Sequence, residues 1–127
     1  MRCMHRSRVY ALLFDTPEAS AAAAFWAAAL GVTARPVADE PQFTRLESAL
    51  PGLVTIVQAV DDAPRFHVDI ETDDVESETA RLLGLGAVQV AQWLECHVLR
   101  APGGHLLCVI PVHSDPGVFE AEAATWP

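Results

Sequence analysis

Apolar and polar positions alternate in short runs along the chain, and turn residues separate one run from the next. The first half opens with an apolar run, RVYALLF, which is followed by an alanine-rich segment that ends at Gly31. Short apolar runs between turn residues are typical of strands, whereas an alanine-rich segment that stops at glycine is typical of a helix. The first half is therefore predicted as β-α-β-β-β: a strand at 8–14, a helix at 18–31, and strands at 32–37, 42–48 and 51–58.

The second half repeats this order without a linker. Its predicted elements are a strand at 65–72, a helix at 75–86, strands at 87–92, 94–100 and 105–111, and a short helical turn in the tail at 118–126. Asp15 or Thr16 is expected to cap the first helix, and Asp73 or Asp74 the second. A repeat at about half the chain length predicts one domain over 1–127, with module one at about 8–58, module two at about 65–111 and a short C-terminal tail.

Composition narrows the class of protein. The chain has 127 residues and a net charge of −9, which disfavours a nucleic-acid partner. The acidic charge either only keeps the protein soluble or also favours neutral or cationic small ligands. No apolar run is long enough to cross a bilayer, so no membrane partner is expected. The apolar run near the N-terminus reads better as a first strand than as a signal peptide. The three cysteines, Cys3, Cys96 and Cys108, lack zinc-finger spacing, which indicates reduced thiols and a cytoplasmic location.

Three segments resemble a known group of proteins: FDTPEASAAAAFWAAALG, FHVDIETDDVESETARLLGLGA and VLRAPGGHLLCVIP. They are similar to the vicinal-oxygen-chelate superfamily, which includes glyoxalase, bleomycin-resistance and extradiol-dioxygenase proteins, and in particular to its glyoxalase-like branch. The resemblance spans about residues 8–112. It implies an α+β fold in which two βαβββ modules form a curved, cup-like mixed sheet with the helices outside. It implies no single reaction, because one scaffold hosts many chemistries.

The resemblance also implies positions for a metal site. Metal-using members place one ligand on each of four strands, and these positions correspond here to Arg8, Gln58, His67 and Cys108. Arginine stays protonated and cannot ligate a metal. One imidazole, one amide and one thiol make a poor site for the hard divalent ions. We therefore predict that the protein holds no metal and no other cofactor.

Strand alternation divides the remaining residues between two faces. The predicted cup face holds Arg8, Tyr10, Leu12, Phe14, Val54, Ile56, Gln58, His67, Asp69, Glu71, Leu106, Cys108 and Ile110. The predicted helix-facing positions are Val9, Ala11, Leu13, Val68, Ile70, Leu107 and Val109. An apolar cavity with a few convergent polar groups is the usual form of a small-molecule site. The predicted ligand-binding residues are His67, Asp69, Tyr10, Trp93, Arg8, Gln58 and Cys108.

Other interpretations of these residues stay open at this point. His67 is either a ligand contact or a semi-buried histidine paired with Asp69 or Arg8, and an Arg8–Asp69 ion pair would plug the cavity. Cys108 is either part of the site or an inert buried thiol, and a cluster of His67, His97 and Cys108 would suit zinc.

Three function classes follow from these observations. The favoured one is a small-molecule-binding protein without the usual metal site, which sequesters or senses a neutral or cationic ligand. The alternatives are a metal-dependent lyase, isomerase or dioxygenase of glyoxalase type, and an interaction module whose cavity is filled by its own side chains. A homodimer is also expected, because sheet edges must be paired or covered and the alanine-rich first helix offers a smooth contact face.

Overall fold

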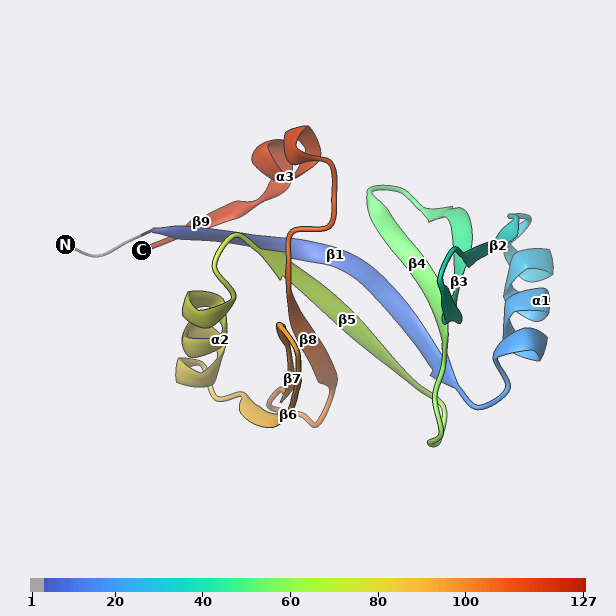
Figure 1. Cartoon of the computed structure of the whole chain (residues 1–127), viewed down its shortest axis with the longest axis horizontal. Helices are drawn as coiled ribbons and strands as arrows, with labels where there is room; N and C mark the ends of the chain where they lie inside the picture. The colour runs from blue at the N-terminus through green and yellow to red at the C-terminus, as the bar shows by residue number, and fades with distance from the viewer. Residues whose placement is uncertain (1–3) are drawn as a thin grey trace. The chain divides into compact units, whose positions relative to one another are not determined.

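The structure, a computed structural model, describes residues 4–127 (Figure 1). The strands of the described chain are β1 (His5–Thr16), β2 (Ala34–Val37), β3 (Glu40–Leu50), β4 (Leu53–Ala59), β5 (Arg65–Thr72), β6 (Val88–Trp93), β7 (Cys96–Arg100), β8 (Leu106–Pro111) and β9 (Ala124–Trp126). The helices are α1 (Ala19–Leu30), α2 (Val75–Gly84) and α3 (Pro116–Glu122).

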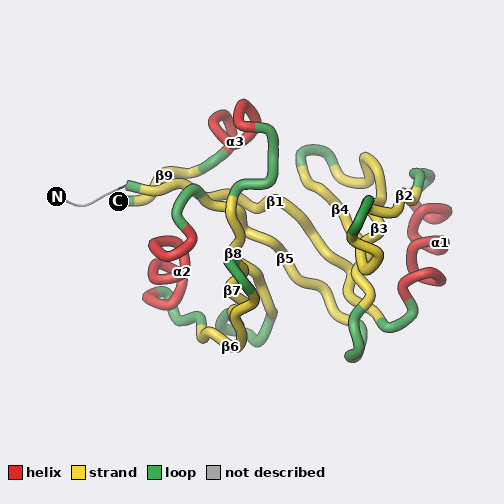
Figure 2. The backbone as a smooth tube through the Cα atoms, in the orientation of Figure 1, coloured by secondary structure: helices red, strands yellow, loops and turns green. Residues whose placement is uncertain are grey.

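The strands join in one mixed sheet (Figure 2). The hydrogen-bonded order is β2-β3-β4-β1-β5-β8-β7-β6, and β9 adds to β1 outside this path. β1 and β4 run parallel, whereas β2–β3, β3–β4, β6–β7 and β7–β8 are antiparallel. The predicted fold class, α+β with two βαβββ modules and a mixed sheet, is confirmed.

The chain divides into two compact units. The central unit is Ala11–His67, and the terminal unit combines the residues up to Tyr10 with Val68–Pro127. β1 and β5 each contribute residues to both units.

The core of the central unit lies between α1 and the strands β3 and β4. Its buried residues are Ala23, Leu46 and Val57, and Phe14 and Trp26 pack against them with their rings edge to face at 5.1 Å. Alanine side chains on α1 let the helix approach the sheet closely. Gly31 ends the helix in a left-handed conformation, at φ 69°, and its N–H donates to the carbonyl of Ala27. The predicted helix with a glycine stop is therefore confirmed.

The predicted faces of β1 are wrong in this unit. Phe14 contacts Trp26 of α1, so Phe14 does not lie on the face of His67, contrary to the prediction. The cause is the register of the parallel pair, which sets Leu13 opposite Ile56 and Phe14 opposite Val57. Leu12 and Phe14 therefore lie on the α1 side of the sheet. Ala11 and Leu13, which were expected to receive a helix, lie on the opposite side.

The predicted cap of the first helix is also wrong. Asp15 and Thr16 are the last residues of β1, and α1 begins after Glu18, which makes no side-chain capping bond. The hydroxyl of Thr16 instead accepts a hydrogen bond from the backbone N–H of Glu18 at 3.1 Å. Proline at position 17 disfavours the helical region for Thr16, so the strand continues to that residue. Asp15 is left inside the sheet, where it is 2% exposed.

The core of the terminal unit lies between α2 and the strands β7 and β8. Its buried members are Leu99, Leu107 and Val109, and partly buried Val68, Ile70, Val75, Leu82, Ala87 and Ala101 pack against them. The helix-facing positions predicted on β5 and β8 are therefore confirmed. Val9 is the exception, because it is 43% exposed.

Asp74 caps α2, as predicted. Its carboxylate accepts from the backbone N–H of Ser77 at 3.0 Å and from the hydroxyl of Ser77 at 2.8 Å. These bonds lower the pKa of Asp74, because they stabilise its ionised form. The negative charge at the helix N-terminus also complements the helix dipole.

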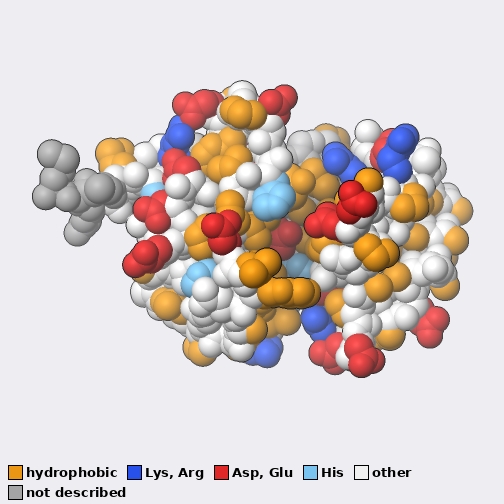
Figure 3. Space-filling view, in the orientation of Figure 1, with side chains coloured by type: hydrophobic (Ala, Val, Ile, Leu, Met, Phe, Trp, Pro, Cys, Tyr) orange, Lys and Arg blue, Asp and Glu red, His pale blue; other side chains and the backbone are white. Residues whose placement is uncertain are grey.

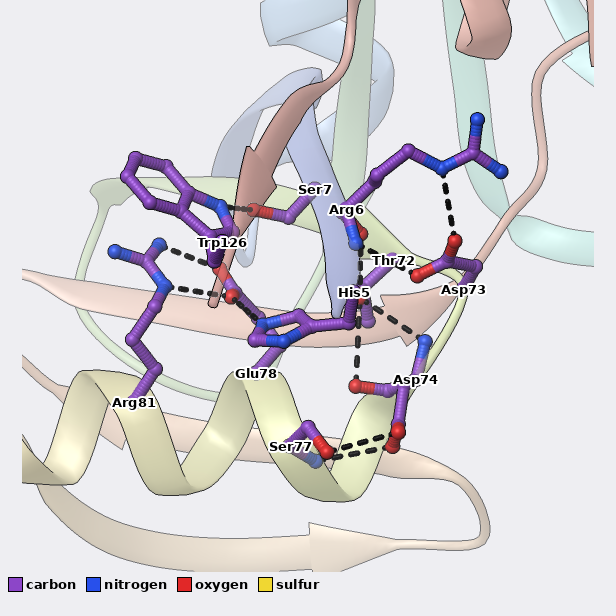
Figure 4. A network of polar contacts seen from close by, with 10 residues as sticks. All are labelled: His5, Arg6, Ser7, Thr72, Asp73, Asp74, Ser77, Glu78, Arg81 and Trp126. Carbon is purple, nitrogen blue, oxygen red and sulfur yellow. Dashed lines mark hydrogen bonds and ion pairs between the residues drawn. The ribbon is translucent and has the colours of Figure 1, made fainter. Parts of the chain in front are cut away.

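The C-terminal tail is more structured than expected. In place of one helical turn at 118–126, it forms α3 and then β9, which pairs with the first residues of β1. Trp126 donates from its indole N–H to the hydroxyl of Ser7 at 2.9 Å, and the guanidinium of Arg81 lies 3.8 Å from the centre of its ring. Figure 4 shows how this tryptophan joins a polar network that connects β1 and α2.

Buried Glu78 is the centre of that network (Figure 4). It accepts two hydrogen bonds from Arg81, both at 2.8 Å, and one from Nε2 of His5 at 2.8 Å. Burial alone would raise the pKa of Glu78, but these bonds outweigh burial and lower the pKa. The network therefore holds α2 and β9 to the first strand, and it was not foreseen from the sequence.

The distribution of charged side chains on the surface agrees with the net charge of −9. Acidic side chains are spread over the face drawn in Figure 3, and the basic ones form no stripe there. Within residues 4–127, no helix has the length and apolar character that a bilayer crossing requires.

Candidate functional site

Polar side chains gather on one face of the central unit, where β1 and β4 end and β5 begins. The parallel pairing of β1 with β4 places Asp15 opposite Gln58. Arg65 and His67 are two residues apart on β5, so they share a face of that strand. Asp15 connects the strands, because its carboxylate lies 2.6 Å from His67 and 3.3 Å from Arg65.

The shortest contact of this group joins Asp15 and His67. Nδ1 of His67 donates to Oδ2 of Asp15 across 2.6 Å. The two side chains are 9% and 1% exposed, so little solvent screens the contact. An ionised carboxylate can only accept hydrogen bonds, and the proton of this bond therefore lies on Nδ1. In the neutral imidazole, the lone pair is then on Nε2.

The second oxygen of Asp15 stands apart from this contact. Among residues 4–127, Oδ1 of Asp15 is buried and has no hydrogen-bond partner. Arg65 does not supply one: its Nε lies 3.3 Å from Oδ2 without the alignment of a hydrogen bond, and its Nη1 donates to Asp62 at 2.9 Å. A buried oxygen without a hydrogen-bond donor destabilises the folded state, so the carboxylate beside His67 is retained at some loss of stability.

The neighbours of Asp15 and Gln58 on this face are largely apolar. Leu13 lies two residues before Asp15 and opposite Ile56, and Phe43 lies opposite Gln58. The central unit thus combines one imidazole, one carboxylate and one amide with aliphatic and aromatic side chains. This combination suits a ligand that has an apolar body and one or two polar groups.

Besides Glu78, the terminal unit contains another buried carboxylate, Glu71, with a different role from Asp15. Arg8 donates to its Oε2 at 3.0 Å, and the hydroxyl of Ser114 donates to the same oxygen at 2.5 Å. The backbone N–H groups of His113 and Ser114 donate to Oε1 at 2.7 and 2.9 Å. Burial would raise the pKa of Glu71, but these four donors outweigh burial and lower the pKa. Glu71 is therefore an anchor for the tail.

The other predicted site residues lie in the terminal unit. Tyr10 contacts the ring of His113 at a centroid distance of 5.6 Å. Asp69 and Cys108 are half-buried, and alternation with the core residues of β5 and β8 places them on the faces turned away from α2. Trp93 is 73% exposed at the end of β6, where every residue is exposed. Ligand contact by these residues stays a prediction.

Sequence reasoning found His67 and Gln58 but missed two residues beside them. Asp15 was interpreted as a helix cap, whereas the structure makes it a partner of His67. The pairing of His67 with Asp69 or Arg8 stays a prediction. Arg65 was not considered at all. One signal was present in the sequence: the residue before a proline favours extended backbone, so Thr16 before Pro17 argues for a longer strand and against a cap.

Comparison with known proteins identifies the fold. The family model for the glyoxalase-like domain matches residues 11–110, which is most of the chain. The chain belongs to the glyoxalase-like domain family. The resemblance to the vicinal-oxygen-chelate superfamily that was noted in the sequence is thereby confirmed. No curated protein matches this glyoxalase-like domain.

Solved structures agree with this assignment at the level of the fold. A hypothetical protein from Bacillus halodurans C-125 is 11% identical with a TM-score of 0.61, and the match covers 86% of this chain and 96% of that one. A glyoxalase/bleomycin resistance protein/dioxygenase superfamily member from Vibrio splendidus 12B01 is 16% identical with a TM-score of 0.50, and the match covers 81% and 96%.

A third solved structure belongs to a named enzyme. A variant of methylmalonyl-CoA epimerase from Streptomyces coelicolor, in complex with 2-nitronate-propionyl-CoA, is 12% identical with a TM-score of 0.51, and the match covers 84% of this chain and 98% of that one. At identities this low, the three solved structures show that the fold is shared and carry no information on the reaction.

A divalent metal does not fit the four positions that the superfamily resemblance indicates. At the first, Arg8 is a cation that pairs with Glu71. At the second and fourth, Gln58 and Cys108 offer an amide and a thiol, which differ in their metal preference. At the third, His67 offers an imidazole whose Nδ1 is bonded to Asp15. At these four positions the glyoxalase-like domain therefore offers one imidazole and no carboxylate, which is a poor donor set for a hard metal ion.

Proposed function

We propose that this glyoxalase-like domain binds a small neutral or cationic molecule, without a resident metal, and sequesters or senses it. The observation that carries the proposal is the Asp15–His67 pair, in which a buried carboxylate holds a nearly buried imidazole in one orientation. A histidine fixed in this way is pre-organised, so a ligand that bonds to it does not have to order it first.

Three further features support the proposal. The same face of the central unit carries Leu13 and Ile56, which suit an apolar ligand body. The net charge of −9 and the charge of Asp15 disfavour a strongly anionic ligand. The three cysteines lack zinc-finger spacing, which supports the cytoplasmic location that belongs to the same proposal.

One observation favours a second candidate, a metal-dependent lyase, isomerase or dioxygenase of glyoxalase type. Metal-ligating histidines commonly donate their second ring N–H to a carboxylate, as His67 does to Asp15. The donor chemistry of Arg8, Gln58 and Cys108 weighs against this candidate, as argued above.

Elemental analysis of the purified protein separates the two candidates. We expect no stoichiometric zinc, iron or nickel in the wild type. One metal ion per chain that is lost in His67→Ala and kept in His97→Ala would refute the metal-free proposal. His97 is the matched control because it also lies on a strand and bonds through Nδ1, in its case to Gln89 at 3.2 Å.

A thermal-shift screen of neutral and cationic small molecules tests binding itself. A ligand that binds only the folded protein raises the melting temperature, and at a concentration about 100 times Kd it adds about 2.7 kcal/mol to the free energy of unfolding. The shift should disappear in His67→Ala and persist in His97→Ala. If no compound in a broad screen raises the melting temperature and no metal is found, the binding proposal is refuted in favour of the third alternative, an interaction module with a filled cavity.

A further inference from the structure

We propose that the central unit carries an interface for a second copy of the chain, formed by the outer face of α1 and by a row of four aromatic rings beside it. The rings of this row are those of Phe25, Trp26, Phe14 and Phe66. The interface is distinct from the candidate ligand site, because Phe66 and His67 are consecutive on β5 and therefore point to opposite faces of that strand.

The four aromatic rings form a continuous row on the central unit. Their centroids are 5.2 Å apart for Phe25 and Trp26, 5.1 Å for Trp26 and Phe14, and 5.0 Å for Phe14 and Phe66, and each pair packs edge to face. The two inner rings are half-buried, whereas Phe25 is 62% and Phe66 57% exposed. Aromatic side chains dominate the energetics of interfaces. A packed row of rings with both ends open to solvent therefore indicates a contact surface.

The outer face of α1 is apolar although it is exposed. The sequence of the helix, ASAAAAFWAAAL, contains no charged residue, and its outer positions include exposed Ala24, Phe25 and Ala28. A surface helix usually carries charged or polar residues on its outer face, and a helix that is apolar all round is usually covered on both sides. The other long helix, α2, follows the first rule with Glu76 and Arg81. The composition of α1 therefore indicates that a partner covers it.

Charge indicates that this partner is a second copy of the chain. Each copy has a net charge of −9, so two copies repel each other least where their contact faces carry no charge, as on α1. A basic partner would find no carboxylate on α1, and a helix that lies on a membrane surface needs lysine or arginine, which α1 lacks. An uncharged apolar face is its own complement, as a contact across a twofold axis requires.

The area of this face is sufficient for a reversible dimer. α1 has 12 residues, so the helix is about 18 Å long and about 10 Å wide, and its outer half offers about 300 Å². The exposed part of Phe66 and the two half-buried rings add about 200 Å². Each copy would then bury about 500 Å² and the pair about 1,000 Å², which is the lower limit for a specific interface. The dimer should therefore be in equilibrium with the monomer.

Sedimentation equilibrium of the full chain over the micromolar range measures this association. Phe66→Ser and Ala24→Arg should each weaken the dimer at least about tenfold, because each substitution acts on both sides of the twofold contact. Arginine is a good helix former and Ala24 is exposed, so α1 should keep its structure, which circular dichroism checks. The matched control is Val88→Ser, because Val88 is as exposed as Phe25, at 62%, but lies on β6 in the terminal unit. The control should associate like the wild type.

Three results would overturn this interface. The first is a wild type that stays monomeric throughout the micromolar range. The second is a dimer that both Phe66→Ser and Ala24→Arg leave intact. The third is a dimer that Val88→Ser dissociates, because the contact would then lie on β6. If Phe66→Ser does not fold, the association of Ala24→Arg decides.

Discussion

Replacement of Glu71 by glutamine tests whether this buried carboxylate anchors the C-terminal tail. Glu71 is fully buried and accepts four hydrogen bonds, one of them from Arg8, whose side chain is 11% exposed. Glutamine keeps the size and one acceptor oxygen, but its amide N–H₂ group would face the donors that now bond to Oε2. The substitution therefore removes a buried ion pair and sets donor against donor, while it creates no cavity.

The expected decrease in the free energy of unfolding follows from this geometry. Loss of one partner of a buried ion pair costs about 3–5 kcal/mol, and the slight exposure of Arg8 places Glu71→Gln near the lower end, at about 3 kcal/mol. This is a large share of the 5–15 kcal/mol that stabilises a typical domain. With a urea m-value of about 2 kcal/mol/M, the unfolding midpoint should fall by about 1.5 M.

Urea unfolding followed by circular dichroism measures this shift. The matched control is Glu120→Gln, because Glu120 is an exposed carboxylate that also pairs with an arginine, Arg6. An exposed pair contributes only about 0–1 kcal/mol, so the control should unfold close to the wild type. Hydrogen exchange should also show faster exchange over residues 112–127 in Glu71→Gln alone. Equal midpoints for the two variants would refute the anchoring role of Glu71.

Four further predictions concern pH, packing, capping and assembly. The pKa of Glu71 is lowered in the folded state, so its contribution to stability is present above the unfolded pKa of about 4.3 and is lost as the pH falls through the folded pKa. Between about pH 5 and 3 the wild type should therefore lose more stability than Glu71→Gln. Parallel curves of stability against pH for the two proteins would contradict this. Leu99→Ala should cost about 2–5 kcal/mol in urea unfolding, because Leu99 is fully buried, and a cost below about 1 kcal/mol would show that the core of the terminal unit is misassigned. Asp74→Ala should cost about 1 kcal/mol through loss of the α2 cap, and an unchanged melting temperature would argue against that cap. Light scattering should show a homodimer, and Phe25, which is 62% exposed on α1, should lie in the dimer contact. A monomer mass at micromolar concentration, or a dimer that Phe25→Ser leaves intact, would count against this prediction.

The elements with local signals could be predicted from the sequence. β5 has the predicted bounds, because turn residues flank it on both sides and Asp74 starts the next helix. α1 ends at Leu30 before Gly31, as the alanine content and the glycine indicated. β9 could not be predicted, because three residues are too few for a pattern and this strand exists only through its pairing with β1.

The candidate site could be predicted only in part, because it also depends on pairing between strands that are distant in the sequence. His67 was identified from its place at the head of a strand, which is local information. Its partner Asp15 lies 52 residues away, and the register of β1 with β4 that decides which side chains share its face is set by the assembled sheet. A shift of one residue exchanges the two faces of a strand, so alternation counted along β1 assigned Phe14 to the wrong side.

The discontinuous terminal unit has a consequence for the order of events during synthesis. Its strand pairing includes Ser7 with Ala124 and His5 with Trp126, which lie far apart along the chain. The central unit, Ala11–His67, is contiguous, and all of its residues have been made by the time the second module begins to emerge. Because folding proceeds from the N-terminus as the chain is made, the central unit can assemble on the ribosome, whereas residues 5–7 of β1 must wait for β9. A nascent chain stalled before residue 124 should therefore protect the central unit from protease while its N-terminal residues remain open to cleavage.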